Sequence, residues 1–266
     1  FETEEELQMW LRKYDYVICG SDQIWNDSIT GDTGAYYAAE CEAKKISYAA
    51  SLGTLNLTGI QKKYMKKYLP DFLAISVREP QSAILIEEYL HLKSEVVLDP
   101  VFLICESEWK HNCMSVGNMK KPFLLLYFLE ENQELLDYAI RYAKENRLAL
   151  YDIHPTLARR HEGFIRLDGV GPKEFLWLIY NAECVCTNSF HATSFSVIFK
   201  KKLLHIPNHK SPERTVSLLN RVGVTLKKEG ELPLYDIKRC EEKGLIEEIQ
   251  RSKDFLRAIL SSEEPR

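Results

Sequence analysis

The sequence predicts an α/β protein made of two lobes, each with a parallel β-sheet. Two observations lead to this prediction. Short apolar runs alternate with longer amphipathic segments, a pattern typical of a parallel sheet with helices on its faces. The alternation stops once, in the polar stretch 113–122, and then resumes. We interpret that stretch as a linker, and place an N-terminal lobe at 1–115 and a C-terminal lobe at 116–266.

Each lobe is expected to contain four strands, because each has four short apolar runs separated by helical patterns. In the first lobe the strands are expected at 16–19, 45–49, 72–77 and 95–98, and the helices at 59–68 and 81–90. In the second lobe the strands are expected at 123–129, 148–151, 183–186 and 203–206, and the helices at 133–145, 172–181, 189–200 and 245–260.

Composition excludes several classes of protein. The 266 residues are 45% hydrophobic, enough for one large core or two smaller ones. The net charge of -4 lacks the basic excess of a nucleic-acid binder. The longest apolar run, 123–129, is far shorter than the ~20 residues that span a bilayer. We therefore expect a cytoplasmic protein. Because the chain begins at Phe1, we also expect an upstream part to be missing.

No metal site is expected. The seven cysteines include no C-x-x-C pair, and Cys184 and Cys186 lie in an apolar run that favours buried free thiols. His191, His205 and His209 do not match the spacing of known metal sites.

The clearest candidate site follows the expected strand 183–186. Ligands of open α/β sheets bind beyond the carboxyl ends of the strands. Here Thr187-Asn188-Ser189 leads directly into a helix, which Asn188 or Ser189 can cap. A helix N-terminus favours an anion, and His191 in its first turn can donate a hydrogen bond or a proton. These residues alone equally allow a capping turn whose histidine only packs.

Other strand ends also carry polar groups. Arg78, after the strand 72–77, can grip a carboxylate or phosphate, or simply pair with Glu79. Gly20-Ser21-Asp22-Gln23 gathers hydroxyl, carboxylate and amide groups, or forms a capped turn; its glycine spacing fits no phosphate loop. We interpret Asp99 as a structural aspartate; His154 follows a strand and can face the cleft, but we interpret it as a loop histidine.

Five strings together resemble the polysaccharide pyruvyl transferase family. They occur in the family's order, which makes the match specific, and the resemblance extends from about Asp15 to about Gly223. The strings are Asp15–Asn26, Lys45–Gly53, Ser76–Glu79, Val97–Leu103 and Thr187–Ser196.

The resemblance implies two Rossmann-like lobes, similar to those of the GT-B glycosyltransferases. It also implies transfer of a pyruvyl group from phosphoenolpyruvate to a sugar of a bacterial polysaccharide, such as an exopolysaccharide, or of its lipid-linked precursor. The products are a cyclic ketal and phosphate. Phosphoenolpyruvate is the donor substrate, so no cofactor is expected. The expected partners are this donor and a glycan or lipid-linked acceptor, with no nucleic acid and no transmembrane segment; a peripheral position at the inner membrane face fits such an acceptor. The family's N-terminal strand and glycine-containing loop are absent from the sequence.

The resemblance also suggests roles for individual residues. His191 is the expected acid, or else the cation that holds phosphate; Arg78 binds an anionic group of phosphoenolpyruvate; and Asp22 is a candidate base. Further substrate-binding residues are expected at Ser21, Ser76, Asn188, Ser189, Phe190 and Arg214. Replacing His191 or Arg78 by Ala should then abolish transfer and leave the fold intact.

Two other functions remain open from the sequence. One is a nucleotide-sugar-dependent glycosyltransferase of the GT-B type, which UDP or GDP would stabilise and phosphoenolpyruvate would not. The other is a catalytically inactive scaffold subunit of a polysaccharide assembly complex, although the presence of both Arg78 and His191 argues against it.

Overall fold

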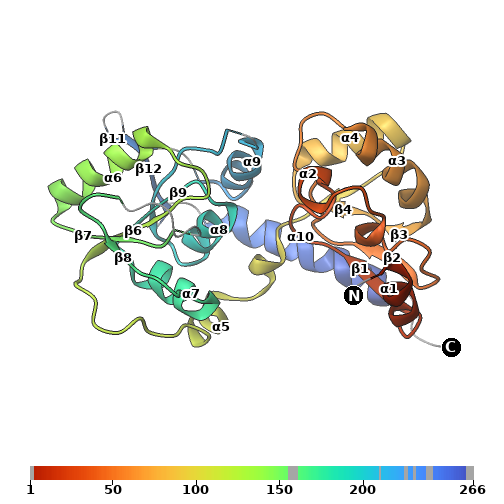
Figure 1. The fold of residues 1–266 in the computed structure, drawn as a ribbon, viewed down its shortest axis with the longest axis horizontal. Coiled ribbons are helices and arrows are strands. Elements are labelled where there is room, and N and C mark those ends of the chain that lie inside the picture. Colours follow the sequence, from red (N-terminus) through yellow and green to blue (C-terminus); the bar gives the residue numbers. More distant parts are fainter. Residues whose placement is uncertain are drawn as a thin grey trace. The chain divides into compact units, whose positions relative to one another are not determined.

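The chain forms two compact units, each an α/β structure with mostly parallel strands (Figure 1). The computed structural model describes residues 3–154, 161–209, 211–224, 227–229, 232–237 and 242–261. Unit 1 consists of Phe1–Leu103 and Ile246–Arg266, and unit 2 of Ile104–Leu245.

Unit 1 contains two small parallel sheets, with strand orders β1-β2-β3 and β4-β5. The strands are β1 (Tyr16–Cys19), β2 (Lys44–Ser47), β3 (Phe72–Ala74), β4 (Ser76–Val77) and β5 (Glu95–Val96). The helices are α1 (Glu4–Leu11), α2 (Asp27–Thr30), α3 (Gly59–Tyr68), α4 (Pro80–Leu90) and most of α10 (Glu242–Ser261). Three 3-10 turns lie at Ala35–Tyr37, Leu69–Asp71 and Pro100–Leu103.

The single strand predicted at 72–77 is wrong, because the run is divided between two sheets. The Ser76 hydroxyl donates to the Ser47 carbonyl at 2.8 Å, and the Ser47 hydroxyl donates to the Ser76 carbonyl at 2.9 Å. These side-chain bonds replace regular ladder bonds where β4 leaves β2. The sequence does not show this division because Ile75, which separates the two strands, is as apolar as the residues of a continuous strand.

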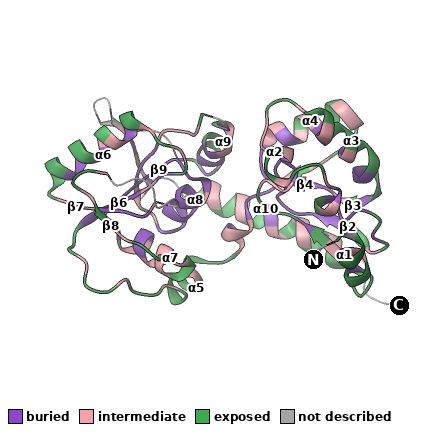
Figure 2. Cartoon of the chain, in the orientation of Figure 1, coloured by how far each residue is buried: buried purple, intermediate pink, exposed green. Residues whose placement is uncertain are grey.

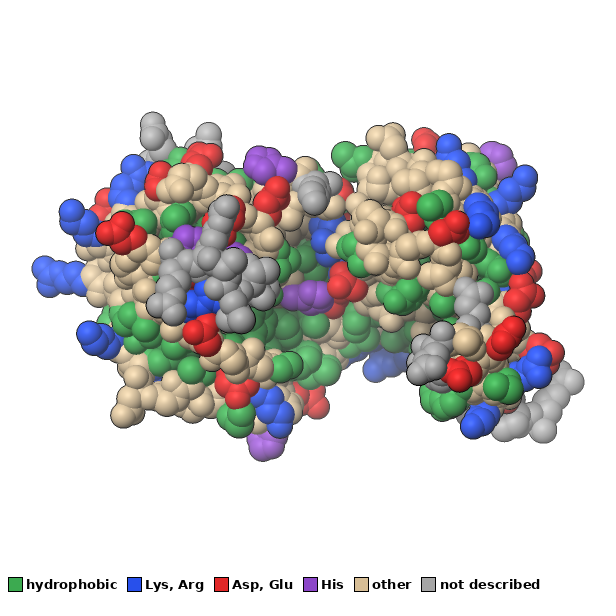
Figure 3. All heavy atoms as spheres, viewed as in Figure 1, with side chains coloured by type: hydrophobic (Ala, Val, Ile, Leu, Met, Phe, Trp, Pro, Cys, Tyr) green, Lys and Arg blue, Asp and Glu red, His purple; other side chains and the backbone are tan. Residues whose placement is uncertain are grey.

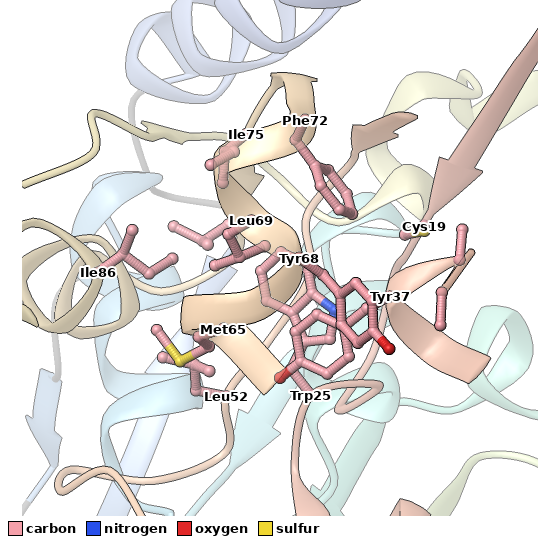
Figure 4. Close-up of a cluster of buried hydrophobic side chains, with 14 of the residues drawn as sticks. Cys19, Trp25, Tyr37, Leu52, Met65, Tyr68, Leu69, Phe72, Ile75 and Ile86 are labelled. Atoms are coloured by element: carbon pink, nitrogen blue, oxygen red, sulfur yellow. The ribbon is translucent and has the colours of Figure 1, made fainter. Parts of the chain in front are cut away.

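The core of unit 1 is rich in aromatic rings. Figure 4 shows Trp25, Tyr37 and Tyr68 gathered beside Met65. Trp25 stacks on Tyr37 with ring centroids 5.4 Å apart, and such pairs contribute about 0.5–1.5 kcal/mol beyond burial of their area. The buried Gln61 amide donates to the carbonyl groups of Trp25 and Leu52, so it fixes the chain that follows β1.

The last helix packs on unit 1, so the predicted division into 1–115 and 116–266 needs correction. The Leu98 N–H donates to the Ser252 hydroxyl at 2.9 Å, and the ring of Phe255 lies 6.4 Å from that of Tyr48. An apolar face on a terminal helix does not reveal which core it covers, because that contact is distant in sequence.

The expected linker 113–122 is also part of unit 2 rather than a boundary. The Met114 N–H donates to the Lys173 carbonyl at 3.0 Å, and the Lys120 N–H donates to the Tyr151 hydroxyl at 2.8 Å. Its polar composition reflects a surface segment held by hydrogen bonds.

Unit 2 contains a seven-stranded sheet in the order β11-β12-β10-β9-β6-β7-β8. Strands β10, β9, β6, β7 and β8 are parallel, whereas β12 and β11 add an antiparallel edge. The strands are β6 (Phe123–Tyr127), β7 (Ala149–Asp152), β8 (Ile165–Arg166), β9 (Cys184–Thr187), β10 (Lys202–Leu204), β11 (Lys227–Glu229) and β12 (Leu232–Asp236). The helices are α5 (Glu106–His111), α6 (Gln133–Asn146), α7 (Pro172–Asn181), α8 (Phe190–Ile198) and α9 (Glu213–Arg221).

Helices cover both faces of this sheet, with α6 on one side and α7 and α8 on the other (Figure 1). The central strands β6 and β9 are buried, as Figure 2 shows. Cys184 and Cys186 are free thiols buried on one face of β9, as their spacing predicts. The sheet therefore presents a rigid, closed core, with its strand ends as the accessible edge.

The surface mixes both signs of charge on the face seen in Figure 3. Among the described residues, no helix combines the length and the apolar character that crossing a bilayer requires.

Candidate active site

A cavity of about 580 Å³ lies at the carboxyl ends of the parallel strands of unit 2. Four strands each bring a lining residue at or just after their last position: Tyr127 from β6, Ile153 from β7, Leu167 from β8 and Ser189 from β9. The opposite wall is the loop 168–171 that leads into α7. This volume is typical of a small-molecule site.

His191 is positioned in this cavity by the first turn of α8. Ser189 caps the helix, since its hydroxyl accepts a hydrogen bond from the Ala192 N–H at 3.4 Å. Every other residue of α8 is buried, whereas His191 is half-buried and lines the cavity. His191 is therefore the residue of α8 whose side chain a ligand in the cavity can contact. The structure thus places His191 and Ser189 where the sequence predicted an anion site.

Asn188 holds the preceding turn rather than facing the cavity. Its side-chain oxygen accepts from the Leu129 N–H at 2.9 Å, and its amide donates to the Glu130 carbonyl. The buried ring of Phe190 packs under Arg214, whose guanidinium carbon lies 5.4 Å from the ring centroid. The side chains of these three residues are not among those that line the cavity; their contacts support the turn, and their substrate-binding roles stay predictions.

A second helix also begins at the cavity. Gly171 is the N-cap of α7, and Pro172 occupies its first turn; both line the wall opposite β9. A helix N-terminus carries partial positive charge equivalent to about half an elementary charge. The positive ends of α7 and α8 thus meet at one cavity, which favours an anionic ligand.

Three polar residues that the sequence did not single out also line the cavity: Arg166, Asp168 and Tyr127. Arg166 lies at the end of β8, where its Nε is 2.6 Å from Asp168 Oδ1. Burial raises the pKa of Tyr127, so its phenol stays protonated and can donate a hydrogen bond. No hydrophobic periodicity in the sequence marks these positions, because they lie at or near the ends of strands that are short or buried. Strand β8, for example, is only two residues long.

His154, interpreted from the sequence as a loop histidine, also lines the cavity. Its Nε2 lies 3.0 Å from Glu131 Oε1, an ion-pair distance, although the two groups are not aligned for a regular hydrogen bond. The sequence feature that pointed to His154 as a cavity residue was its position just after β7. Residues at the ends of β6, β8 and β9 also line the cavity.

His205 supports the site from beneath. Its Nδ1 lies 2.8 Å from the Thr187 carbonyl oxygen, and its Nε2 lies 2.9 Å from the Thr215 hydroxyl. Burial lowers the pKa of His205 to about 4, and the hydrogen bond with Thr187 only partly opposes this effect. His205 is therefore neutral near pH 7, with Nδ1–H donating to the carbonyl that precedes the α8 turn.

Arg78 in unit 1 is surrounded by carboxylates. Its Nε lies 2.8 Å from Glu79, its Nη1 3.1 Å from Asp99 and its Nη2 3.3 Å from Asp22. The side chain is only 2% exposed. Burial acts to lower the pKa of Arg78, but the surrounding carboxylates outweigh it and raise that pKa. One cation among three anions gives a net negative cluster, which disfavours a phosphate.

The sequence-predicted residues around Arg78 thus form a closed network instead of an open anion site. Ser21 shares its hydroxyl between Asp99 Oδ2 at 2.9 Å and the Ala49 carbonyl at 3.1 Å. Ser76 is buried and bonded to β2, so the substrate-binding role predicted for it is replaced by a structural one. Asp22 differs, because 58% of its side chain is exposed.

The backbone explains why Gly20 precedes this cluster. Gly20 has a φ of +143°, and a Cβ at this position would lie 2.1 Å from the Tyr48 carbonyl oxygen. Only glycine fits where the chain passes so close to the end of β2. Among the described residues, no group of three metal-ligating side chains comes together.

Comparison with solved structures confirms the predicted fold class. A UDP-N-acetylglucosamine 2-epimerase from Rickettsia bellii superimposes with a TM-score of 0.59 at 14% identity, over 97% of this chain and 77% of that chain. A putative UDP-N-acetylglucosamine 2-epimerase from Listeria monocytogenes gives a TM-score of 0.58 at 11% identity, over 98% of this chain and 80% of that chain. These neighbours are of the GT-B type, and the likeness concerns the fold alone.

Comparison with curated proteins finds no match. The family model described as polysaccharide pyruvyl transferase, however, matches residues 3–210, which include the Arg78 cluster and the whole α8 turn. On this match, the chain belongs to the polysaccharide pyruvyl transferase family.

Proposed function

We propose that this protein transfers a pyruvyl group from phosphoenolpyruvate to two hydroxyls of one sugar, forming a cyclic ketal and releasing phosphate. The acceptor is a sugar of a polysaccharide or of its lipid-linked precursor. The observation that carries the proposal is the cavity of unit 2, where the N-termini of α7 and α8 meet beside His191. Family membership supports the same reaction.

The donor's chemistry fits such a cavity. Phosphoenolpyruvate carries a phosphate and a carboxylate on a three-carbon skeleton, so it needs positive potential without a large apolar pocket. The two helix N-termini supply positive potential, the Arg166 guanidinium supplies donors although its charge is shared with Asp168, and the Tyr127 phenol supplies a further hydrogen-bond donor. His191 adds a group that can both donate a hydrogen bond and move a proton.

The reaction needs two proton transfers. A proton added to the methylene carbon of phosphoenolpyruvate makes the methyl group and leaves an oxocarbenium-like C2. One acceptor hydroxyl adds to C2, the C2–O bond to phosphate breaks, and the second hydroxyl closes the ketal. Two hydroxyl protons are lost; one replaces the proton that was placed on the methyl group, and the other leaves with hydrogen phosphate. His191 is assigned to donate a proton or to hold the phosphate.

The Arg78 cluster belongs to the same proposal in a different role. Its network fixes Asp22 and the Gly20–Asp22 turn, and the exposed Asp22 carboxylate is a candidate to bind or deprotonate an acceptor hydroxyl. Arg78 then acts by positioning carboxylates rather than by gripping the donor.

The test is an assay with phosphoenolpyruvate and a panel of galactosides, glucosides, mannosides and UDP-linked sugars. We expect phosphate release that depends on the acceptor, and a product whose methyl signal in NMR shows a ketal. Phosphoenolpyruvate should also raise the Tm of the protein.

A nucleotide-sugar-dependent glycosyltransferase is the competing function. If UDP raises the Tm, phosphoenolpyruvate does not, and no acceptor releases phosphate, the pyruvyl-transfer proposal is wrong. One neighbour, the enzyme from Neisseria meningitidis, is described as bound to UDP-GlcNAc and has a TM-score of 0.53 at 11% identity, so this control is informative.

A further inference from the structure

A second histidine faces the cavity that contains His191. His154 follows β7 directly, and its side chain is 8% exposed while its residue lines the cavity. A histidine so far buried must have its ring orientation fixed by its neighbours. His154 is therefore held in place, in contrast to a histidine on a surface loop.

His154 is the first member of a chain of alternating histidines and carboxylates, and Glu131, at ion-pair distance from it, is the second. Glu131 lies 3.0 Å from His154 through Oε1 and 3.3 Å from His161 Nε2 through Oε2. His161 in turn places Nδ1 2.8 Å from Oδ2 of Asp152, the last residue of β7. The order along the chain, starting at the cavity, is His154, the more exposed Glu131, His161 and the buried Asp152.

The burial of this chain fits a role in handling protons. The Asp152 side chain is 1% exposed and that of His161 is 7% exposed, so a buried carboxylate is balanced by an adjacent imidazole. Glu131 is 34% exposed and connects the two rings. A base whose ring is oriented by a carboxylate is the usual arrangement of catalytic histidines.

The other charged groups at this cavity are already engaged or fit a different role. Arg166 pairs with Asp168 at 2.6 Å, and the phenol of Tyr127 is kept protonated by burial. His191 lies at the positive end of α8, which suits a proton donor or an anion ligand. Among the described residues that line the cavity, His154 is thus the group best arranged to accept a proton.

We propose that His154 removes the proton from the acceptor hydroxyl that attacks C2, and that Glu131 is its positioning residue. This inference rests on the proposed pyruvyl transfer and assigns its base to His154, which leaves Asp22 the role of binding an acceptor hydroxyl. As the hydroxyl oxygen bonds to C2, its proton moves to the His154 imidazole, and the resulting charge is stabilised by the Glu131 carboxylate. The proton then leaves with hydrogen phosphate, so the imidazole returns to its neutral form.

The experiment compares His154→Gln, Glu131→Gln and Glu131→Asp with wild type in the acceptor-dependent assay. His209→Gln is the matched control, because His209 is an exposed histidine of the same unit outside the cavity lining. Each variant is measured for kcat/KM between pH 5 and 9, an interval of about two units on either side of neutral, and for phosphoenolpyruvate affinity by calorimetry.

We expect His154→Gln to lower kcat/KM by about 10²–10⁴-fold, with phosphoenolpyruvate affinity changed less than about twofold. Loss of a base also removes the fall of kcat/KM at low pH, a change that a merely structural role would not produce. Glu131→Gln should lower kcat/KM on the order of tenfold, Glu131→Asp should restore part of it, and His209→Gln should match wild type.

The outcomes separate this inference from the proposed function. Acceptor-dependent turnover by wild type together with near-normal rates in both His154→Gln and Glu131→Gln contradicts the inference alone. An unchanged low-pH limb in Glu131→Gln and His154→Gln contradicts it as well. If wild type fails to turn over phosphoenolpyruvate with every acceptor of the panel, both the proposed function and this inference are contradicted. If His154→Gln does not fold, the Glu131 variants alter a partly exposed side chain and still decide the question.

Discussion

The Arg78 cluster of unit 1 and the His191 cavity of unit 2 both follow the carboxyl ends of parallel strands, but they differ in how their charges are satisfied. Arg78 is buried and has carboxylates around all three of its nitrogen atoms. His191 is half-buried at the rim of a cavity, with helix N-termini as its main electrostatic surroundings.

This contrast shows that a strand end is necessary for a ligand site but not sufficient. Buried charges that neutralise one another stabilise the local fold. They exert little net electrostatic attraction on a ligand. The α8 N-terminus has no acidic residue in its first turn, whereas α7 has Glu174 there, so the dipole of α8 in particular can act on a ligand that enters the cavity. We therefore expect substitutions in the two regions to alter different measurements, activity for one and stability for the other.

The largest expected effect is on activity. His191→Gln should lower kcat/KM for phosphoenolpyruvate-dependent transfer by about 10²–10⁴-fold, because it removes the proton-transfer group at the α8 N-terminus. Stability should change by less than about 0.5 kcal/mol, since His191 lies at the rim of the cavity. Transfer rates and urea denaturation check this; wild-type rates in the variant would contradict the assigned role.

The next effect is on stability. Arg78→Ala should destabilise unit 1 by about 3–5 kcal/mol, because it leaves Glu79 and Asp99 buried without their cation. The buried network thus predicts a destabilised fold, whereas the sequence alone led us to expect an intact one. Urea denaturation followed by the fluorescence of the buried Trp25 measures it. Arg257→Ala, which removes an exposed ion pair of the same unit, is the control and should cost less than about 0.5 kcal/mol.

Acid should weaken the support beneath the α8 turn. The pKa of His205 is lowered from 6.5 to about 4 in the folded protein, so the unfolded chain binds the proton first as pH falls. Stability is therefore highest above pH 6.5 and decreases as pH approaches 4, by roughly 3 kcal/mol from this group. Denaturation at several pH values checks the slope, and His205→Gln should be less stable at pH 7 but should show a shallower decrease.

The smallest effect is expected at Asp22, the exposed member of the Arg78 cluster. Asp22→Asn should cost less than about 1 kcal/mol, because its contact with Arg78 is 3.3 Å long and partly solvated. Transfer activity decides between two bases: a decrease of kcat/KM by 10²-fold or more would favour Asp22 over His154, whereas a change of a few-fold is expected if His154 accepts the proton.

Several elements were predictable from the sequence because their patterns are local. The bounds of α3 and α7 agree with the prediction, since a capping box at Thr58 and a Pro172 in the first turn mark where these helices begin. The split of the strand 72–77 and the packing of α10 on unit 1 were not predictable. They depend on hydroxyl bonds and contacts between residues distant in sequence.

The sequence alone determined the α/β class and the family, and it predicted the turn at Ser189–His191 as an anion site, because strand and helix periods and short motifs are encoded in neighbouring residues. The tertiary structure decided which polar groups share a site. It placed His154 in the lining of the cavity that contains His191, with Glu131 and then His161 in contact beyond it. It also surrounded Arg78 with carboxylates. The reason is that charge compensation depends on distances between side chains, and only the packed fold sets those distances.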